Sequence, residues 1–233
     1  MAQQTETAQR PGLSRDRVLR VAVGLADASG IDAVSMRNIA QSLGVVPMAL
    51  YKHIANKEEL LAGMVDIVVA EIDPPTDGDD WKAAVRARIL SARRALLRHP
   101  WASQLLESSA SPTMAVLDYT DSLIGVFRAG GLSADLTHHA MHALGSRIWG
   151  FTQLLFPDPP AGAPSPDAAL AALGARFPHI AEIAMTAAHD DASMVGQGCD
   201  DQFEFEFALD LMLDGLERLH HAGWTSAERA SEG

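Results

Sequence analysis

Apolar residues recur at helical spacing along most of this chain, and this periodicity limits the folds that it can adopt. Near the N-terminus the spacing i, i+3, i+4, i+7 and i+8 is occupied by Val18, Val21, Ala22, Leu25 and Ala26. These positions form one stripe along a helix. The segment FEFEF alternates as a strand would, yet Phe203, Phe207 and Leu211 also form a helical stripe. Because Ala and Leu dominate and β-branched alternation is scarce, we expect an all-α fold.

The composition indicates a protein with a packed core in a reducing compartment. Hydrophobic residues make up 48% of the chain, which argues against global disorder. The single cysteine, Cys199, excludes an intramolecular disulfide and the usual zinc sites with several cysteines. The N-terminus lacks an apolar signal core, and no run of about eighteen apolar residues follows it. We therefore expect a cytoplasmic protein without a membrane span.

Capping residues predict a small helical domain over residues 14–73. Ser14, Ser35 and Asn56 each precede an apolar helical pattern and are suited to accept a hydrogen bond from its first turn. Gly44 can take the positive φ of a tight turn between the second and third helices. The proline three residues later suits the first position of the third helix, where its missing N–H would be unbonded anyway. The domain ends where two prolines interrupt the fourth helix.

A larger helical domain is predicted over residues 79–222, after an acidic link. The two ends of the chain, residues 1–13 and 223–233, are expected to be flexible. Its helices are expected at about residues 81–99, 101–107, 111–130, 133–156, up to 173, 178–188 and 202–221. The stretches 156–167 and 189–201 are expected to be loops. The last helix has a second apolar face beside that of Phe203, Phe207 and Leu211, formed by Phe205, Leu209, Met212, Leu216 and Leu219. One face would cover the helix's own core, and the simplest cover for the other is a second subunit.

The charge is distributed unevenly along the chain, whose formal net charge is −12. Up to Lys57 there are seven basic and four acidic residues, whereas the remainder has eleven basic and twenty-six acidic ones. A basic end that faces phosphates and an acidic body that stays away from them would produce this asymmetry. The basic excess is small, so the charge permits nucleic-acid binding without establishing it.

The stretch from Ser35 to Leu61 reads SMRNIAQSLGVVPMALYKHIANKEELL, with a Gly-Val turn, then Leu-Tyr-x-His, then Lys-Glu-Glu-Leu-Leu. This arrangement resembles the helix-turn-helix of the tetracycline-repressor (TetR) family of bacterial transcription regulators. ALLRHPW (95–101) and FALDLMLDGLERL (207–219) resemble the ligand-binding and dimerisation half of the family's tetracycline-repressor-like branch. The resemblance covers nearly the whole chain. It implies a three-helix DNA-binding domain joined through a fourth helix to a larger effector-binding and dimerisation domain.

The resemblance also implies contacts to the phosphate backbone of DNA. Tyr51, His53 and Lys57 would contact phosphates, which supply most of the affinity in such complexes. Ser35 and Arg37 would add a phosphate site at the start of the second helix, where the helix dipole favours an anion. For Tyr51, packing within the small domain is the alternative interpretation.

Base contacts would come from the third helix. Its exposed first turn would meet thymine methyls, through Val46, Pro47, Met48 and Ala49. Lys52 is the long polar side chain that would reach a guanine edge, while Leu50 would anchor the helix to its own core. Val46 departs from the family, which usually has a polar residue here, so this helix lacks a side-chain cap.

The larger domain would hold a small-molecule effector in a mostly apolar pocket. The residues expected to line it are Trp101, Gln104, Leu105, Met114, Phe127, His138, Met141, His142, Trp149 and Gln153. His138, His142, Trp149 and Gln153 are expected on roughly one face of a single helix. For any one of these residues, a place in the core or in a dimer interface is the simpler interpretation. The segment after His99 lacks the drug ligands of the tetracycline repressor, so tetracycline is not the expected effector.

His138 and His142 could ligate one metal ion, but zinc normally needs a third protein ligand. We expect neither a metal nor a cofactor.

Two alternatives to a regulator remain open. An all-helical enzyme could use the Asp118/Asp121 pair or the histidines, but the chain shows no nucleophile motif or Gly-rich phosphate loop. A helical protein that binds small molecules or other proteins without reading DNA is the other alternative. We expect a homodimeric repressor, not an enzyme, that a small-molecule effector releases from a palindromic operator in double-stranded DNA.

Overall fold

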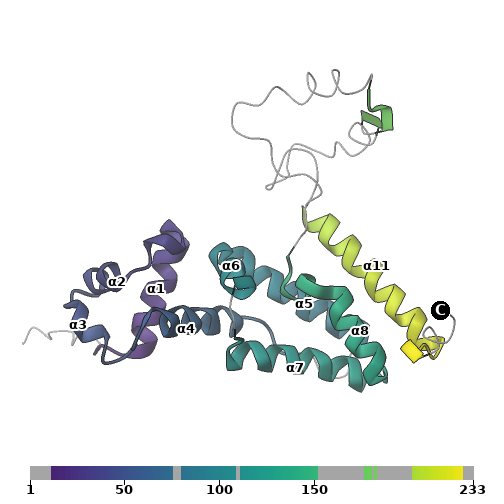
Figure 1. Ribbon diagram of the computed structural model, residues 1–233, viewed down its shortest axis with the longest axis horizontal. Helices are drawn as coiled ribbons and strands as arrows, with labels where there is room; N and C mark the ends of the chain where they lie inside the picture. The colour runs from purple at the N-terminus through teal and green to yellow at the C-terminus, as the bar shows by residue number, and fades with distance from the viewer. Residues whose placement is uncertain are drawn as a thin grey trace, which may run out of the picture. The chain divides into compact units, whose positions relative to one another are not determined.

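The structure is a computed structural model that describes residues 12–75, 80–108, 111–151, 176–179, 181–182 and 201–227. Within these residues all regular elements are helical, which confirms the all-α prediction (Figure 1). The elements are α1 (Arg15–Ser29), η1 (Ile31–Ala33), α2 (Met36–Leu43), α3 (Pro47–Leu50), α4 (Lys57–Val69), α5 (Trp81–Arg98), α6 (Pro100–Ser108), α7 (Met114–Ala129), α8 (Ala134–Leu144), η2 (Gly145–Trp149) and α11 (Asp201–His221). No helix in the described part of the chain is long and apolar enough to cross a membrane.

Internal contacts divide the chain into two compact units. The first comprises Met1–Gly78 and Leu90–Val126, and the second comprises Asp79–Ile89 and Phe127–Gly233. The divisions fall inside α5 and α7, so each of these helices begins in one unit and ends in the other. The functional boundary at residues 74–78 therefore stays a proposal from the sequence.

The predicted caps hold the helices of the first unit in place. The side chains of Ser14, Ser35 and Asn56 accept hydrogen bonds from backbone N–H groups three residues later, at 3.2, 3.1 and 2.8 Å. Each bond satisfies one of the amides that a helix leaves unpaired at its start. Val46 precedes α3 without a side-chain cap, and Pro47 occupies the first turn. All four helix starts thus follow from local sequence chemistry.

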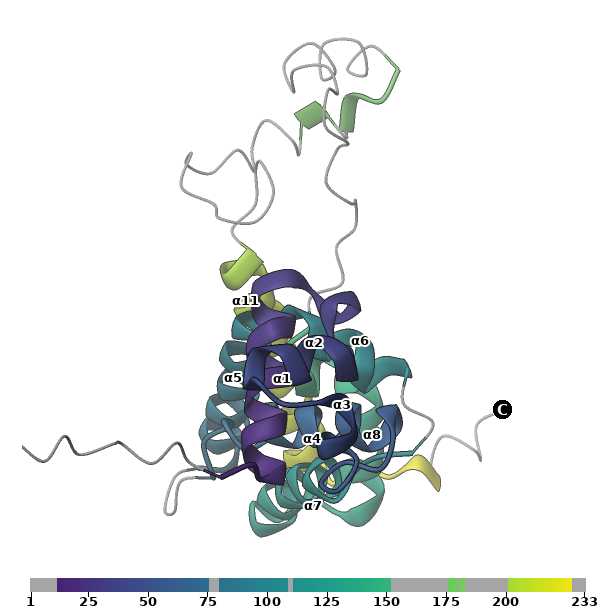
Figure 2. The same ribbon diagram turned by 90° about the vertical axis from the view of Figure 1, so that its left-hand side faces the viewer.

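The small core of the first unit lies between α1, α2 and α4, with α3 packed on α2 (Figures 1 and 2). Leu50 and Ile54 are completely buried, so they hold the segment after the turn against this core. α1 and α4 approach closely at Gly63, because a Cβ there would lie 2.8 Å from both terminal carbons of Leu19. The core thereby fixes the orientation of α3.

The helix that begins after Ser133 is shorter than expected. Ser133 caps it as predicted, accepting from the N–H of Leu136 at 3.0 Å, but α8 ends at Leu144. The physical cause is Gly145, whose φ of +49° is incompatible with a continuing right-handed helix. A 3-10 segment follows as far as Trp149. The expected helix to residue 156 is therefore wrong, and the loops at 156–167 and 189–200 lie outside the described residues.

α11 is helical through the FEFEF segment, as predicted, and packs on α8. Its inner face buries Phe205, Leu209, Leu213 and Leu216. Leu219 and Met212, which the sequence pattern also assigned to this face, are exposed and half-buried respectively. The opposite face exposes Phe203, Phe207 and Leu211 to 58% each. One side of α11 thus completes the core, and the other presents an apolar stripe.

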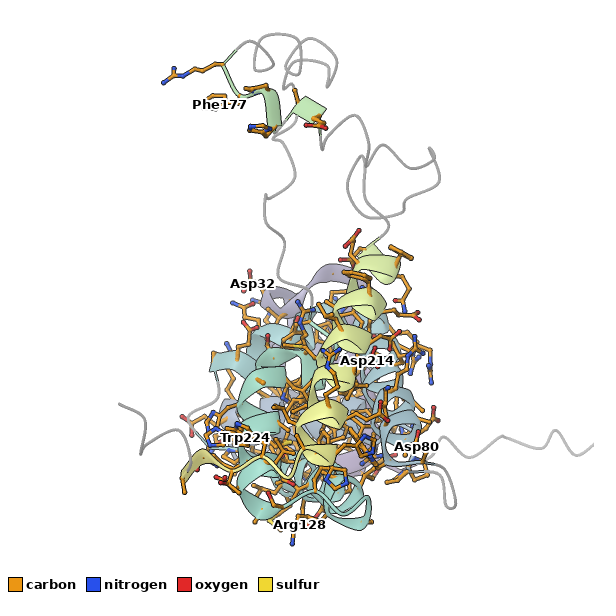
Figure 3. All side chains as sticks on the ribbon, turned by 90° about the vertical axis from the view of Figure 1, so that its right-hand side faces the viewer. Asp32, Asp80, Arg128, Phe177, Asp214 and Trp224 are labelled. Carbon is orange, nitrogen blue, oxygen red and sulfur yellow. The ribbon has the colours of Figure 1, made fainter. Side chains whose placement is uncertain are left out.

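Ion pairs attach α11 to the first half of α5. Lys82 contacts Asp214 at 2.5 Å and Glu217 at 2.8 Å, and Figure 3 labels Asp214 on α11. Arg86 donates to Asp210 at 2.6 Å and to Glu206 at 2.6 Å. The hydrogen bond with Asp214, followed by that with Glu217, raises the pKa of Lys82 above its ordinary value. Part of the acidic excess after Lys57 therefore serves to hold α11 against α5 through these four carboxylates.

Candidate nucleic-acid interface and effector site

The turn between α2 and α3 has the geometry that the sequence predicts. Gly44 takes the left-handed conformation, with φ +68° and ψ +34°, and its N–H bonds to the carbonyl oxygens of Ala40 and Gln41. A residue without Cβ adopts this conformation at no steric cost. The turn therefore directs the chain from α2 straight into α3 within three residues.

The first turn of α3 projects large apolar side chains into solvent. Leu50 is 0% exposed, whereas Val46 is 68% and Met48 is 72% exposed. The burial of Leu50 fixes the rotation of this short helix, so the side chains on its other faces point outward. Pro47 is exposed and Ala49 is half-buried. Apolar groups gathered on the surface of a small domain are typical of a contact surface for a partner.

α3 is shorter than the sequence pattern suggested. It ends at Leu50, and Tyr51, Lys52 and His53 lie in the turn that follows. The N–H groups of His53 and Ile54 both bond to the carbonyl of Leu50, at 2.8 and 3.0 Å. Tyr51 is 47% exposed, so the alternative in which it packs within the small domain is not supported. Lys52 is exposed and His53 is half-buried in the same turn.

Glu59 organises the start of α4, where Lys57 is the first residue. Its Oε2 accepts from the N–H of Ala55 at 2.8 Å, and its Oε1 accepts from Nε of Arg15 at 3.3 Å. Its own N–H donates to Asn56 Oδ1 at 2.8 Å. The bond from Ala55, followed by the bond from Arg15, lowers the pKa of Glu59. The prediction missed this role, although Asn-x-x-Glu is a readable capping signature.

Several basic residues of the first unit have structural partners and others are exposed beside α3. Arg15 pairs with Glu59, and Arg20 pairs with Asp16 at 2.9 Å. Arg37, Lys52 and Lys57 are exposed. The Oγ of Ser35 accepts from the N–H of Asn38, so its hydroxyl oxygen serves the helix cap. A surface with a few cations around an apolar centre can bind a polyanion while reading its base edges.

The predicted effector residues fall into both compact units. In the first unit, Trp101 is buried and its indole N–H donates to Asp27 Oδ1 at 2.6 Å. Gln104 and Met114 are exposed there, and Leu105 is half-buried. The indole hydrogen bond of Trp101 is a structural role that the sequence did not reveal.

The remaining effector candidates belong to the second unit. Phe127 is fully buried and its ring lies 5.7 Å from that of Trp81. His138 and His142 are exposed, with ring centroids 4.6 Å apart, and Met141 is half-buried. Trp149 lies in the 3-10 segment beyond Gly145, so it does not continue the helical face of the two histidines. Gln153 lies outside the described residues.

The described part of the structure gives no geometric support to a metal site or to an acid–base pair. In the part of the chain that the structure describes, His138 and His142 are not joined by a third metal-ligating side chain. Asp118 and Asp121, the candidate acid–base pair, are exposed on α7. An acid–base pair needs a sheltered site that tunes its proton affinity, and an open helix surface supplies none.

Comparisons with known proteins agree with this arrangement. Residues 18–64 match the tetR family of bacterial regulatory proteins, and residues 74–220 match the tetracyclin repressor-like C-terminal domain. The HTH-type transcriptional repressor DrrR1 of Streptomyces coeruleorubidus is 35% identical over 126 residues, which are 53% of this chain and 47% of that protein. The chain thus spans about half the length of this curated relative.

Solved structures show the same fold. A possible TetR family transcriptional regulator from Streptomyces coelicolor A3(2) aligns with a TM-score of 0.66 at 26% identity, over 88% of this chain and 100% of that chain. The Streptomyces coelicolor TetR family protein ActR, in complex with (S)-DNPA, aligns with a TM-score of 0.69 at 24% identity, over 89% of this chain and 98% of that chain. The matches confirm the resemblance found in the sequence: this chain belongs to the TetR family of bacterial regulatory proteins.

Proposed function

We propose that the protein is a ligand-responsive transcriptional repressor that binds a palindromic operator as a homodimer in the cytoplasm. The observation that carries this proposal is the exposed first turn of α3, with Val46 and Met48 in solvent beside Tyr51 and Lys57. A core side chain, Leu50, holds this turn in place. The name of the curated relative, a transcriptional repressor, supports the sign of the regulation.

The contacts to DNA divide into phosphate and base contacts. Tyr51, His53 and Lys57 would donate to phosphates on one side of the major groove, and Arg37 with the start of α2 would contact the backbone on the other. The side chains of α3's first turn would contact thymine methyls, and Lys52 would reach a guanine edge. The hydrogen bonds of Glu59 hold the turn that carries Lys57. Less freedom would therefore be lost on binding.

A second copy of the chain would cover the exposed face of α11. Phe203 and Phe207 stack with ring centroids 6.4 Å apart, and Leu211 extends the same stripe. Such a stripe is self-complementary across a two-fold axis. Two α3 helices would then enter successive major grooves about 34–36 Å apart, which is why the operator should be palindromic.

The effector site is proposed within the part of the chain that matches the tetracyclin repressor-like C-terminal domain, residues 74–220. Binding of an effector would favour a conformation in which the two α3 helices no longer fit both half-sites. By linkage, the operator would then weaken effector binding by the same factor.

Selection of bound sequences from random duplex DNA, at two salt concentrations, tests this proposal. A palindrome should be recovered, and each phosphate contact should contribute about 0.9 to the slope of log affinity against log salt. Lys57→Ala should therefore reduce the slope by about 1.8 in a dimer with one contact per subunit. Arg176→Ala removes one exposed charge elsewhere and should leave the slope unchanged.

The dimer is tested separately, so that a failure can be assigned. Phe207→Glu should give monomers in sedimentation, because it places charge in an apolar interface. The matched change Leu97→Glu, at an exposed position of α5, should leave the dimer intact. If no DNA sequence were enriched by a dimeric wild-type protein, sequence-specific binding would be refuted and the helical ligand-binding alternative would replace it.

A further inference from the structure

A buried histidine connects the ends of α1 and α4 to the junction of α5 and α6 in the first compact unit. His99 is only 8% exposed and lies between α5 and α6. Its Nδ1 is 2.7 Å from Oδ1 of Asp27, in the last turn of α1. Its Nε2 is 3.2 Å from Oε1 of Glu71, just beyond the end of α4. One imidazole ring therefore contacts residues at the C-terminal ends of α1 and α4, two of the three helices around the small core of the first unit.

The backbone fixes this ring at the junction of α5 and α6. The N–H of His99 bonds to the carbonyls of Ala95 and Leu96, which closes α5, and its carbonyl accepts from Ala102 at 2.9 Å. Pro100 begins α6 and cannot extend α5. The histidine side chain consequently has little freedom to leave its two carboxylates.

The hydrogen-bond pattern requires the protonated ring. A neutral imidazole has one N–H and one lone pair, whereas both nitrogens here face carboxylate oxygens. The Oδ1 of Asp27 already accepts from the indole of Trp101 at 2.6 Å. Glu71 Oε2 accepts from Arg98 at 2.5 Å. Only the imidazolium donates to Asp27 and Glu71 together.

Charge balance leads to the same conclusion. The charged groups that face the ring are Asp27 from α1, Glu71 after α4 and, through Glu71, Arg98 on α5. The adjacent Asp73 and Arg94 form a pair of their own at 2.9 Å. With an imidazolium, two anions meet two cations; with a neutral ring, one carboxylate loses its cationic partner. The side chains of Asp27 and Glu71 are 32% and 34% exposed, so solvent screens part of that loss.

The hydrogen bonds around the ring favour the ionised form of Glu71. Burial acts to raise the pKa of Glu71, but the hydrogen bonds from Arg98 and His99 outweigh it, so this pKa lies below its ordinary value. Among the side chains of this cluster, imidazole is the type whose charge changes between about pH 5 and 8.

We propose that the cluster of Asp27, Glu71 and His99 is a proton-dependent clasp, which holds α1 and α4 most firmly in the orientation that fits the operator while His99 is protonated. The inference rests on the proposed function, because operator affinity is its main consequence. Loss of the proton removes one of the ring's two contacts and leaves that carboxylate with only its bond from Trp101 or Arg98, so α1 or α4 is held less firmly at the α5–α6 junction. The fraction of protein competent to bind DNA then falls, and the apparent affinity falls with it.

The test compares wild-type protein with His99→Gln, whose amide is neutral at every pH. Fluorescence anisotropy would give the affinity for the selected palindrome at about pH 6 and about pH 8. All other ionisable groups, including His53, are common to both proteins, so their difference isolates His99. The ratio of the affinity at the lower pH to that at the higher pH should be about five times larger for wild type than for His99→Gln. His139→Gln, at an exposed histidine of α8, should behave as wild type.

A second measurement needs no DNA. Amide exchange in the last turn of α1 and in residues 66–71, corrected for intrinsic rates, should become faster from about pH 6 to about pH 8 in wild type but not in His99→Gln. An equal pH response of affinity in the two proteins, or an exchange profile that ignores pH, would overturn the clasp while leaving the repressor proposal intact. Failure of wild type to bind any operator would instead refute the proposed function, and exchange would still decide on the clasp.

Discussion

Two glycines of the first unit allow the turn of the DNA-reading element to be tested with one chemical change. At both Gly44 and Gly24 an added Cβ would meet no atom within 4 Å, so Gly→Ala introduces no clash at either position. Gly44 has φ +68°, whereas Gly24 lies within the right-handed helix α1. The two substitutions therefore differ only in backbone conformation, and their effects on stability should have opposite signs.

The magnitudes follow from that difference. An L-residue in the left-handed region costs about 1–2 kcal/mol, partly offset by the reduced freedom of alanine in the unfolded chain. Gly44→Ala should thus lower the unfolding free energy by about 1 kcal/mol. Gly24→Ala should raise it by about 0.5–1 kcal/mol, because glycine is unfavourable inside a helix. Gly44→Asn should recover part of the loss, since asparagine tolerates this conformation.

Thermal unfolding at one fixed protein concentration would measure these effects. A change of 1 kcal/mol corresponds to roughly 2–4 °C in Tm for a chain of this size. Gly44→Ala should also weaken operator binding, because the turn directs α3, whereas Gly24→Ala should not. If both alanine variants shifted Tm in the same direction, the attribution of the turn to backbone conformation would be refuted.

Three further outcomes are expected. Arg86→Met should lower the free energy of unfolding by about 1 kcal/mol, a value that allows for the partial exposure of its ion pairs with α11. Urea unfolding would measure this loss, which should be smaller in high salt. The pKa of Glu71 in the folded protein is lowered from 4.5, so ionised Glu71 stabilises the fold fully above about pH 4.5, and this contribution is lost as the pH falls through the lowered pKa. Glu71→Gln should therefore flatten the acid side of a plot of unfolding free energy against pH. Gly130→Ala should lower Tm more than Gly44→Ala, because its Cβ would collide with the side chain of Trp81.

Helix starts and the reading element were predictable because their causes are local. A cap is a hydrogen bond across three residues, so Ser14, Ser35 and Asn56 could be recognised without knowing the fold. Gly44 was predictable for the same reason, since a tight turn needs a residue without Cβ. The FEFEF helix was also predictable once its apolar positions were followed over several turns.

The errors arose where one local signal had two interpretations. Gly145 lies within the helix expected over residues 133–156, but its positive φ ends α8. The face expected to combine His138, His142 and Trp149 was lost with that helix. Likewise α3 stops at Leu50. Leu50 and Ile54 can both be buried whether the chain between them forms an irregular turn or a further turn of helix. Spacing alone cannot separate these cases.

The sequence by itself determined the all-α class, the capped helices and the turn between α2 and α3, since each depends on neighbours within a few positions. Only the tertiary structure decided which charges are structural. The contacts of His99 join residues 72 and 28 positions apart, and Arg86 meets Asp210 across 124. Such pairs leave no periodic signal, because they depend on how the helix ends come together after the apolar faces have packed.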